Sequence, residues 1–350
     1  MIITEKKMKI AIAQGFGFPE RWKMYCEQKM IVFKMVDPYA LDIIEQVADC
    51  NAFMWHFFHS NEKDYLCAKP ILHALELAGK KVFPDHRTMW HFDDKVGQNY
   101  LMEALQFPVV PTYIFYEKKK AMTWADTAAF PKVFKLRGGA GSKNVKLVKT
   151  KAQAKRLIRK AFSSGFAQYD KFESLKERWR RYRLGLAPFV EVLKGIGRLF
   201  HTTAYARTVG KEKGYIYFQD FIANNNFDIR IIIIGNKAFG IKRLVRNKDF
   251  RASGSGNIVY EKSQINEDCI KLAFDLNLKL KSQCVAYDFI FDKEKKPLIV
   301  EMSYGFNKAG YDFCEGYWDK HLNWYEGPFN PYGWMIENLI GEEDGGNTRR

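Results

Sequence analysis

The stretch that decides the fold is KVFKLRGGAGSKNVKLV, residues 132–148. An apolar run at 132–136 leads into a Gly-rich segment at 138–145, and a second apolar run follows at 145–148. This order predicts a β-hairpin with a glycine-built tip. Glycines let backbone N–H groups approach a phosphate without an intervening side chain. The hairpin therefore predicts a phosphate-binding loop, and a plain hairpin turn is the alternative.

The loop and its preceding strand offer the groups that a phosphate needs. We assign the loop role to Gly138, Gly139, Gly141 and Ser142, whose N–H groups and hydroxyl can donate hydrogen bonds. Lys135, at the end of the preceding strand, adds a cation. No Gly-Lys-Ser/Thr sequence follows at Walker spacing, so this loop is not a P-loop.

Two acids occur in consecutive apolar strands much further along the chain. Asp288 lies within VAYDFIF and Glu301 lies near the end of PLIVEMS. A carboxylate in an apolar strand is costly to bury without a partner, and acids on adjacent strands can meet on one face. Mg²⁺ prefers a few carboxylate oxygens and completes its shell with phosphates and water. The pair predicts a Mg²⁺ site, and salt-bridged strand acids are the alternative.

Two further segments contribute polar groups. In YFQDFIANNNFDIR, residues 217–230, one strand ends and another begins, and the exposed backbone at 220–222 can bind an adenine edge. Arg251 lies in the Gly/Ser loop DFRASGSGN, after Lys242 and Arg243 on the preceding predicted strand. Guanidinium groups suit carboxylates and acyl phosphates because they bind two oxygens at once.

In order and spacing, these pieces resemble the ATP-grasp superfamily, on its glutathione synthetase and ribosomal-protein glutamate ligase side. The resemblance covers roughly residues 90–305, from Asp-Asp-Lys at 93–95 to Glu301. It implies an α/β fold in which two α+β ATP-grasp subdomains clasp ATP. Strand–helix alternation independently predicts a small parallel α/β domain at residues 1–110. We expect a lid subdomain with the Gly-rich flap at 111–215 and a C-terminal subdomain at 216–350.

The resemblance also implies roles for single residues. Lys95 and Lys135 would contact the phosphates and adenine of ATP, and Asp228 would lie near the ribose. The adenine hinge would comprise Gln219, Asp220, Phe221 and Ile222, although family members usually carry Glu where Asp220 stands. Arg230 and Arg251 would hold the acyl phosphate, and we include Lys242 with them as catalytic.

The metal ligands implied by the resemblance are Asp288, Glu301 and Ser303. The family pattern ends Glu-x-Asn, whereas residues 301–303 of this chain read Glu-Met-Ser. Ser303 offers a weaker, neutral hydroxyl, and Asn307 is the alternative third ligand.

The implied activity is an ATP- and Mg²⁺-dependent ligase, with Mn²⁺ as an alternative metal, that joins a small-molecule carboxylate to an amine through an acyl phosphate. The tail CEGYWDKHLNWYEGPFNP, residues 314–331, looks like that of ATP-grasp proteins among bacterial surface-polysaccharide enzymes. A nucleotide-linked sugar is therefore a candidate substrate, and an aromatic core or docking strap is the alternative for the tail. The competing functions are an ATP-grasp kinase acting on a non-carboxylate acceptor and a non-enzymatic, basic nucleotide- or nucleic-acid-binding protein.

Composition limits the remaining classes. The chain has 350 residues and a formal charge of +16, which suits anionic substrates or a nucleic acid. Its six cysteines form no C-x-x-C pair, and no apolar run is long enough to span a bilayer. We expect a cytoplasmic protein with no membrane or nucleic-acid partner, and a homodimer stays open. The basic stretch at 171–183 predicts an amphipathic helix, with either a solvated or a phosphate-facing basic side.

Overall fold

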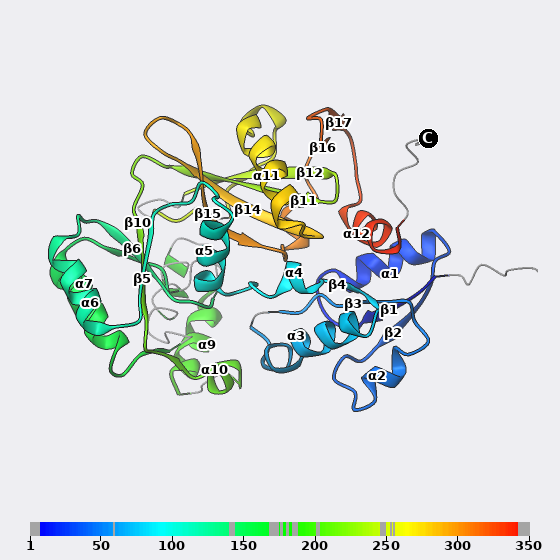
Figure 1. Cartoon of the computed structure of the whole chain (residues 1–350), viewed down its shortest axis with the longest axis horizontal. Coiled ribbons are helices and arrows are strands. Elements are labelled where there is room, and N and C mark those ends of the chain that lie inside the picture. Colours follow the sequence, from blue (N-terminus) through cyan, green and yellow to red (C-terminus); the bar gives the residue numbers. More distant parts are fainter. Residues whose placement is uncertain are drawn as a thin grey trace, which may run out of the picture.

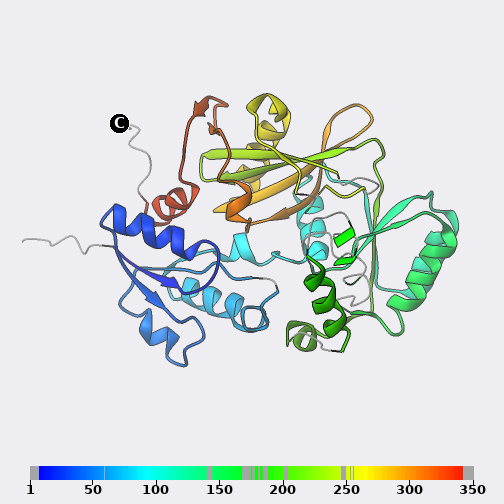
Figure 2. The same cartoon turned by 180° about the vertical axis from the view of Figure 1, so that it is seen from behind.

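The computed structural model describes residues 8–58, 60–139, 144–167, 175, 178–179, 182–183, 188–200, 204–245, 250–252, 254 and 256–341. In this part of the chain three main sheets and their helices lie side by side (Figure 1), and Figure 2 shows the same arrangement from behind. Each helix of the described residues is too short or too polar to cross a lipid bilayer.

The N-terminal domain is built on a parallel sheet with strand order β2-β1-β3-β4. The pairs β1–β2, β1–β3 and β3–β4 are all parallel, so the predicted parallel α/β domain is confirmed. The central strand has the sequence KIAIA and is almost completely buried, as expected for a strand covered on both faces. The elements are β1 (Lys9–Ala13), α1 (Pro19–Gln28), β2 (Val32–Val36), α2 (Ile43–Gln46), β3 (Ala52–Met54), α3 (Glu62–Leu77), β4 (Lys81–Phe83) and α4 (His86–Met89).

The lid subdomain contains an antiparallel sheet with strand order β5-β10-β6-β7. The predicted glycine-tipped hairpin is the pair β6–β7, in which Lys132 lies opposite Val148. Gly141 and Ser142 of its tip lie outside the described residues. The elements are β5 (Thr112–Phe115), α6 (Lys118–Thr127), β6 (Lys132–Lys135), β7 (Lys146–Val148), α7 (Lys151–Ala161), β8 (Phe166–Ala167), α9 (Phe189–Phe200), α10 (Ala204–Val209), β9 (Lys211–Glu212) and β10 (Ile216–Asp220).

The C-terminal subdomain contains a larger, antiparallel sheet. Among the described strands its order is β15-β14-β11-β12-β16-β17, and β13 pairs with β12. The elements are β11 (Phe227–Ile234), β12 (Lys237–Leu244), β13 (Ile258–Val259), the 3₁₀ turn η1 (Lys262–Gln264), α11 (Glu267–Leu280), β14 (Cys284–Phe291), β15 (Pro297–Ser303), the 3₁₀ turn η2 (Lys308–Gly310), β16 (Gly316–Asp319) and β17 (Trp324–Glu326).

Strand β11, with the sequence FDIRIIII, shows why this sheet lies in the middle of the molecule. Successive side chains of a strand point to opposite faces. Ile231 and Ile233 join the core beneath α11, whereas Ile232 and Ile234 join the core of the N-terminal domain. The C-terminal sheet and the N-terminal domain therefore share one core, while the lid has a core of its own.

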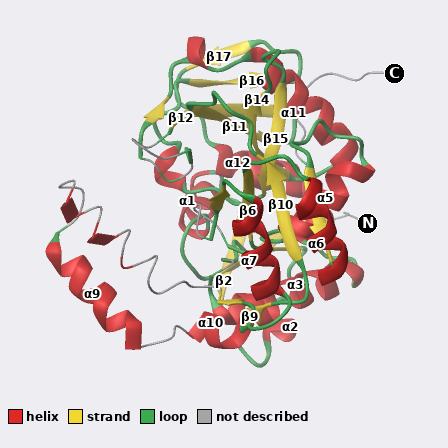
Figure 3. Ribbon diagram, turned by 90° about the vertical axis from the view of Figure 1, so that its left-hand side faces the viewer, coloured by secondary structure: helices red, strands yellow, loops and turns green. Residues whose placement is uncertain are grey.

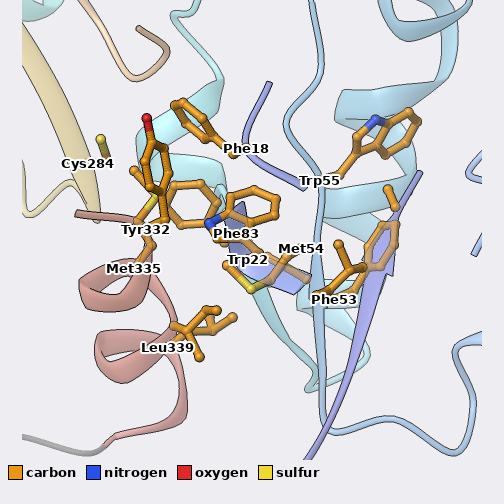
Figure 4. Close-up of a cluster of buried hydrophobic side chains, with 14 of the residues drawn as sticks. Phe18, Trp22, Phe53, Met54, Trp55, Phe83, Cys284, Tyr332, Met335 and Leu339 are labelled. Atoms are coloured by element: carbon orange, nitrogen blue, oxygen red, sulfur yellow. The ribbon is translucent and has the colours of Figure 1, made fainter. Parts of the chain in front are cut away.

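Two helices pack away from their neighbours in sequence. Helix α5 (Lys95–Ala104) contacts β15. Its N-cap residue Asp94 accepts a hydrogen bond from Gly97 N. The last helix, α12 (Pro331–Ile340), packs against α1 and β4. Figure 4 shows Tyr332, Met335 and Leu339 of α12 beside Trp22 and Phe83 of the N-terminal domain.

These contacts change one predicted boundary. We expected the C-terminal subdomain to begin at residue 216, but β10 pairs on both sides with lid strands β5 and β6. Backbone hydrogen bonding to both neighbours makes β10 an inner strand of the lid sheet, so the sheet boundary follows Asp220. The other predicted domain boundaries remain predictions.

Candidate active site

A pocket lies between the lid sheet and the C-terminal sheet. The empty space is about 900 Å³, which includes space open to solvent. It brings together two lysines, one glycine of the hairpin, the predicted hinge and both predicted metal-binding acids. The residues of the prediction that line it are Lys95, Lys135, Gly139, Gln219, Asp220, Phe221, Ile222, Asp228, Arg251, Asp288 and Glu301.

Lys135 reaches the pocket from the end of β6. Its side chain is buried, and its Nζ donates a hydrogen bond to Gln219 Oε1 at 2.7 Å. Burial lowers the pKa of Lys135 to about 8, against the opposing effect of the Glu301 carboxylate. A buried lysine whose charge is only weakly stabilised by neighbouring carboxylates is suited to bind an anionic ligand such as a phosphate.

Lys95 enters from the first turn of α5 and contacts both walls. Its Nζ donates to Gly139 O at 2.6 Å and lies 3.2 Å from Glu301 Oε1. Burial would lower the pKa of Lys95, but the carboxylates of Glu301 and Asp93 raise it above its ordinary value. Lys95 therefore links the glycine hairpin to one of the predicted metal ligands.

The glycine hairpin is held at its base by acids. Gly139 N donates to Asp93 Oδ1 at 2.7 Å, and Gly138 N donates to Glu212 Oε1 at 3.1 Å. Gly139 has a φ of +104°, a conformation that only glycine adopts without strain. Burial raises the pKa of Asp93 to about 6. Asp94 caps α5, whereas its neighbour Asp93 holds the hairpin.

The two predicted metal ligands face one another on neighbouring strands. Asp288 of β14 lies directly opposite Glu301 of β15, next to an irregularity in the pairing. Asp288 Oδ1 lies 2.8 Å from Arg230 Nε, and Asp288 Oδ2 lies 2.9 Å from Arg243 Nη2. Burial would raise the pKa of Asp288, but these guanidinium groups hold it below its ordinary value. The carboxylate is therefore ionised, as a metal ligand must be.

The hinge residues close the opposite side of the pocket. Gln219 Nε2 donates to Thr112 Oγ1 at 3.2 Å, and the Asp220 carboxylate forms an ion pair with Lys132 of β6. Apolar side chains, among them Val133 and Ile290, also line the pocket, as is usual for small-molecule sites. Lys132 was not predicted, although the pairing of β6 with β10 places it opposite Asp220.

With this geometry in view, comparisons with known proteins identify the fold. A sequence model of the family described as "RimK-like ATP-grasp domain" matches residues 199–311, which include the hinge, Asp228, Arg230, Asp288 and Glu301. Residues 199–311 therefore belong to the ATP-grasp superfamily.

Solved structures support this ATP-grasp fold over nearly the whole chain. A RimK domain ATP-grasp protein from Sphaerobacter thermophilus is 13% identical, with a TM-score of 0.56 over 95% of this chain and 98% of its own. N5-carboxyaminoimidazole ribonucleotide synthetase from Thermotoga maritima is 12% identical, with a TM-score of 0.58 over 95% of this chain and 76% of its own. D-cycloserine synthetase is 13% identical, with a TM-score of 0.57 over 95% and 99%. A search of curated protein sequences found no match.

Arg243 is a residue of this ATP-grasp site that the sequence analysis did not assign. Its Nε and Nη2 bind Asp228 Oδ1 and Oδ2 at 2.6 and 2.8 Å, and the same Nη2 contacts Asp288. Asp228, predicted to lie near a ribose, lines the pocket with its carboxylate held by this fork. The register that places Asp228 opposite Arg243 is the signal that would have identified it.

Lys242, for which we expected a catalytic role, points to the other face of the sheet from Arg243. Neighbours in a strand point to opposite faces, so Arg243 and Lys242 cannot both face the pocket. Lys242 Nζ instead donates to Gln264 Oε1 at 2.9 Å and lies 4.2 Å from the centre of the Phe227 ring. Lys242 is not among the residues that line the pocket, and its catalytic role stays a prediction.

The two predicted catalytic arginines differ in position. Arg251 lines the pocket, whereas Arg230 lies behind Asp288 and contacts its carboxylate. Burial would lower the pKa of Arg230, but Asp288 raises it. Tyr311 also hydrogen-bonds Arg230, so this guanidinium is fixed on two sides.

Neither alternative for a third metal ligand lines the pocket. Ser303 Oγ donates to Gly305 O at 3.0 Å and accepts from Gly305 N at 3.2 Å. Asn307 Oδ1 accepts from Ala309 N at 3.3 Å. Within the described residues no group of three His, Cys, Asp or Glu side chains is arranged to hold a metal. Asp288 and Glu301 fit a Mg²⁺ ion that takes its other ligands from phosphate and water.

Proposed function

We propose that this protein is an ATP-dependent ligase that activates a carboxylate as an acyl phosphate and joins it to an amine. The observation that carries the proposal is the convergence of Lys95 and Lys135 on the Asp288–Glu301 pair around one pocket. Cations and paired carboxylates at such short range are the groups that hold a metal-bound triphosphate. The relatives with the same fold include enzymes named as synthetases.

The nucleotide lies with its adenine at residues 219–222 and its phosphates toward the lysines. Lys135 projects from the strand that leads into the hairpin, so its ammonium group neutralises charge on the phosphate chain. Lys95 joins the hairpin backbone to Glu301, and it therefore couples loop position to the metal site.

Asp288 and Glu301 would hold Mg²⁺, and Mn²⁺ would be a suitable replacement because it shares the preference for oxygen ligands. When bound, the ion offsets the negative charge of the transferring phosphoryl group. Arg230 and Arg243 keep the Asp288 carboxylate ionised and fixed in orientation.

The carboxylate substrate attacks the γ-phosphorus of ATP, the bond to the β-phosphate oxygen breaks, and ADP leaves. Arg251, which lines the pocket, is placed to bind the acyl phosphate and the oxyanion that forms when the amine adds. Closure of the glycine hairpin excludes water, which otherwise hydrolyses the acyl phosphate.

For the substrates, we propose an amino acid as one partner and a nucleotide-linked sugar as the other, in the synthesis of a surface polysaccharide. The aromatic tail supports this choice. A second hollow lies between α1 and the tail, and Tyr311, which hydrogen-bonds Arg230, forms part of its lining. The hollow also contains groups that bind sugar hydroxyls, such as Arg21, Asp312 and Asn330.

The test is a screen of amino acids and nucleotide sugars for stimulated phosphate release from MgATP, with the product identified by mass. We expect ADP, phosphate and an amide product with one pair of substrates. A stable phosphorylated product would instead identify an ATP-grasp kinase. Strongly salt-dependent nucleic-acid binding without any ATP turnover would identify a binding protein.

A further inference from the structure

Helix α9 presents an apolar face to solvent. Phe189, Val190, Leu193 and Ile196 are 45%, 53%, 52% and 43% exposed. At about 100° per residue, these positions fall within roughly a third of the helix circumference. Figure 3 shows α9 at the edge of the molecule, well separated from the lid sheet. An exposed apolar face of this kind marks an interaction site.

The opposite side of α9 is packed, which fixes the direction of the exposed face. Val192 is only 3% exposed, and a side chain at Gly195 would meet Arg178 and Leu175 within about 3 Å. Arg178 also forms an ion pair with Glu191. The exposed residues are therefore the outer face of a packed unit.

Two aromatic residues extend this face. Trp179 and Tyr182 are 48% and 40% exposed, and their ring centres are 5.9 Å apart. The Tyr182 ring lies 5.1 Å from the Phe189 ring. We call these two residues and the four of α9 the α9 surface. Trp and Tyr favour the boundary between apolar and aqueous phases because each has an apolar body and a polar end.

The charge around the α9 surface is positive. Of the charged side chains that the structure describes between residues 175 and 196, Arg178, Arg183 and Lys194 are basic. Among those that the structure describes, Glu191 is the only acid, and both Arg178 and Lys194 engage it. A second copy of this chain would bring two positive surfaces together. An anionic bilayer instead offers an apolar interior beneath negatively charged headgroups.

We propose that the α9 surface binds anionic lipid bilayers, with its apolar residues in the interface and the basic residues at the headgroups. This differs from the sequence-based expectation of no membrane partner. The amphipathic helix predicted at 171–183 does not include α9, and most of it lies outside the described residues. The surface lies outside the nucleotide pocket, so the proposal is independent of the ligase assignment.

The test is flotation of the full chain with phosphatidylcholine vesicles and with vesicles that contain phosphatidylglycerol. We expect binding to the anionic vesicles that weakens as salt is raised. The double variant Leu193→Glu, Ile196→Glu should reduce the bound fraction by about tenfold or more, because it places charges in the apolar interface. Lys194→Glu should weaken binding without altering the apolar face.

Leu278→Glu is the matched control, because Leu278 is 74% exposed on α11, in another part of the molecule. It should bind anionic vesicles like the parent chain. Circular dichroism and nucleotide binding of each variant will show whether the fold is retained. Equal binding by the double variant, or no binding by the parent chain, overturns the proposal. A dimer in sedimentation velocity that the double variant abolishes would overturn it in favour of a second copy.

Discussion

The two faces of the C-terminal sheet are made by the same strands but have different chemistry. The face beneath α11 is apolar and includes Ile229, Ile231 and Phe289. The opposite face, at its lid end, carries the charged groups of Asp228, Arg230, Arg243, Asp288 and Glu301. Successive residues of a strand alternate between the two faces. Of two neighbouring residues, one therefore packs in the apolar core and the other lies on the charged face.

The difference teaches how this fold separates stability from chemistry. Burying ion pairs rarely stabilises a protein more than apolar packing does, since each charge loses its hydration. Asp228, Arg243 and Asp288 are nevertheless 9%, 6% and 7% exposed. We infer that the charged face is retained for the orientation of its carboxylates, while the α11 face provides apolar stabilisation.

The largest expected effect comes from neighbouring residues on opposite faces. Arg243→Met leaves two buried carboxylates without this partner, and it should lower the free energy of unfolding by about 3–5 kcal/mol. Lys242→Met removes a partly exposed amine and should change the free energy of unfolding by about 0.5 kcal/mol or less. Urea unfolding measures both, and similar losses in the two variants would contradict the assignment of faces.

A second effect concerns activity rather than stability. Lys135→Met should lower ATP-dependent phosphate release by about 10²–10³-fold, as expected for loss of a positioned charge in a catalytic site. It should not lower the free energy of unfolding, because burial of this ammonium group is unfavourable. Lys296→Met, on an exposed lysine of the C-terminal subdomain, is the control. Undiminished turnover in Lys135→Met would refute its role at the phosphates.

A smaller effect tests the apolar face. Ile231 has an exposed fraction of 0%, so Ile231→Val should cost about 0.5–1.5 kcal/mol of stability by removing one buried methyl group. Nucleotide affinity should stay the same, because the side chain points toward α11. Thermal unfolding and nucleotide titration check the two halves of this prediction, and a weaker affinity would mean that the faces are coupled.

The smallest effect is a pH dependence of nucleotide binding. Burial lowers the pKa of Lys135 to about 8 from 10.5, so above pH 8 the free protein loses this proton. Bound phosphates favour the charged amine, so binding should take up a proton and weaken by up to about tenfold per pH unit between those values. Below pH 8 Lys135 is already charged and adds no dependence.

Calorimetry with ADP at pH 9, in buffers with different ionisation enthalpies, measures the proton uptake directly. The uptake should disappear at pH 7 and in Lys135→Arg, whose guanidinium stays charged throughout. Proton uptake at pH 9 that survives in Lys135→Arg would assign the titration to another group.

Much of the local structure could be predicted because its signals lie close together in the chain. Asp94 starts α5, glycines end β6, and apolar runs form β14 and β15. The pairing of β10 with two lid strands could not be predicted, because its partners lie far away in sequence. The same reason explains why Lys242 was preferred to Arg243, since only the register with β11 distinguishes their faces.

The sequence by itself determined the elements, the glycine hairpin and the types of residue suited to phosphate and metal binding. It did so because capping, turn formation and strand alternation act between near neighbours. The tertiary structure alone decided which of these residues meet. Lys95 reaches Gly139 and Glu301, and α12 returns to the N-terminal domain, through contacts between segments that folding brings together.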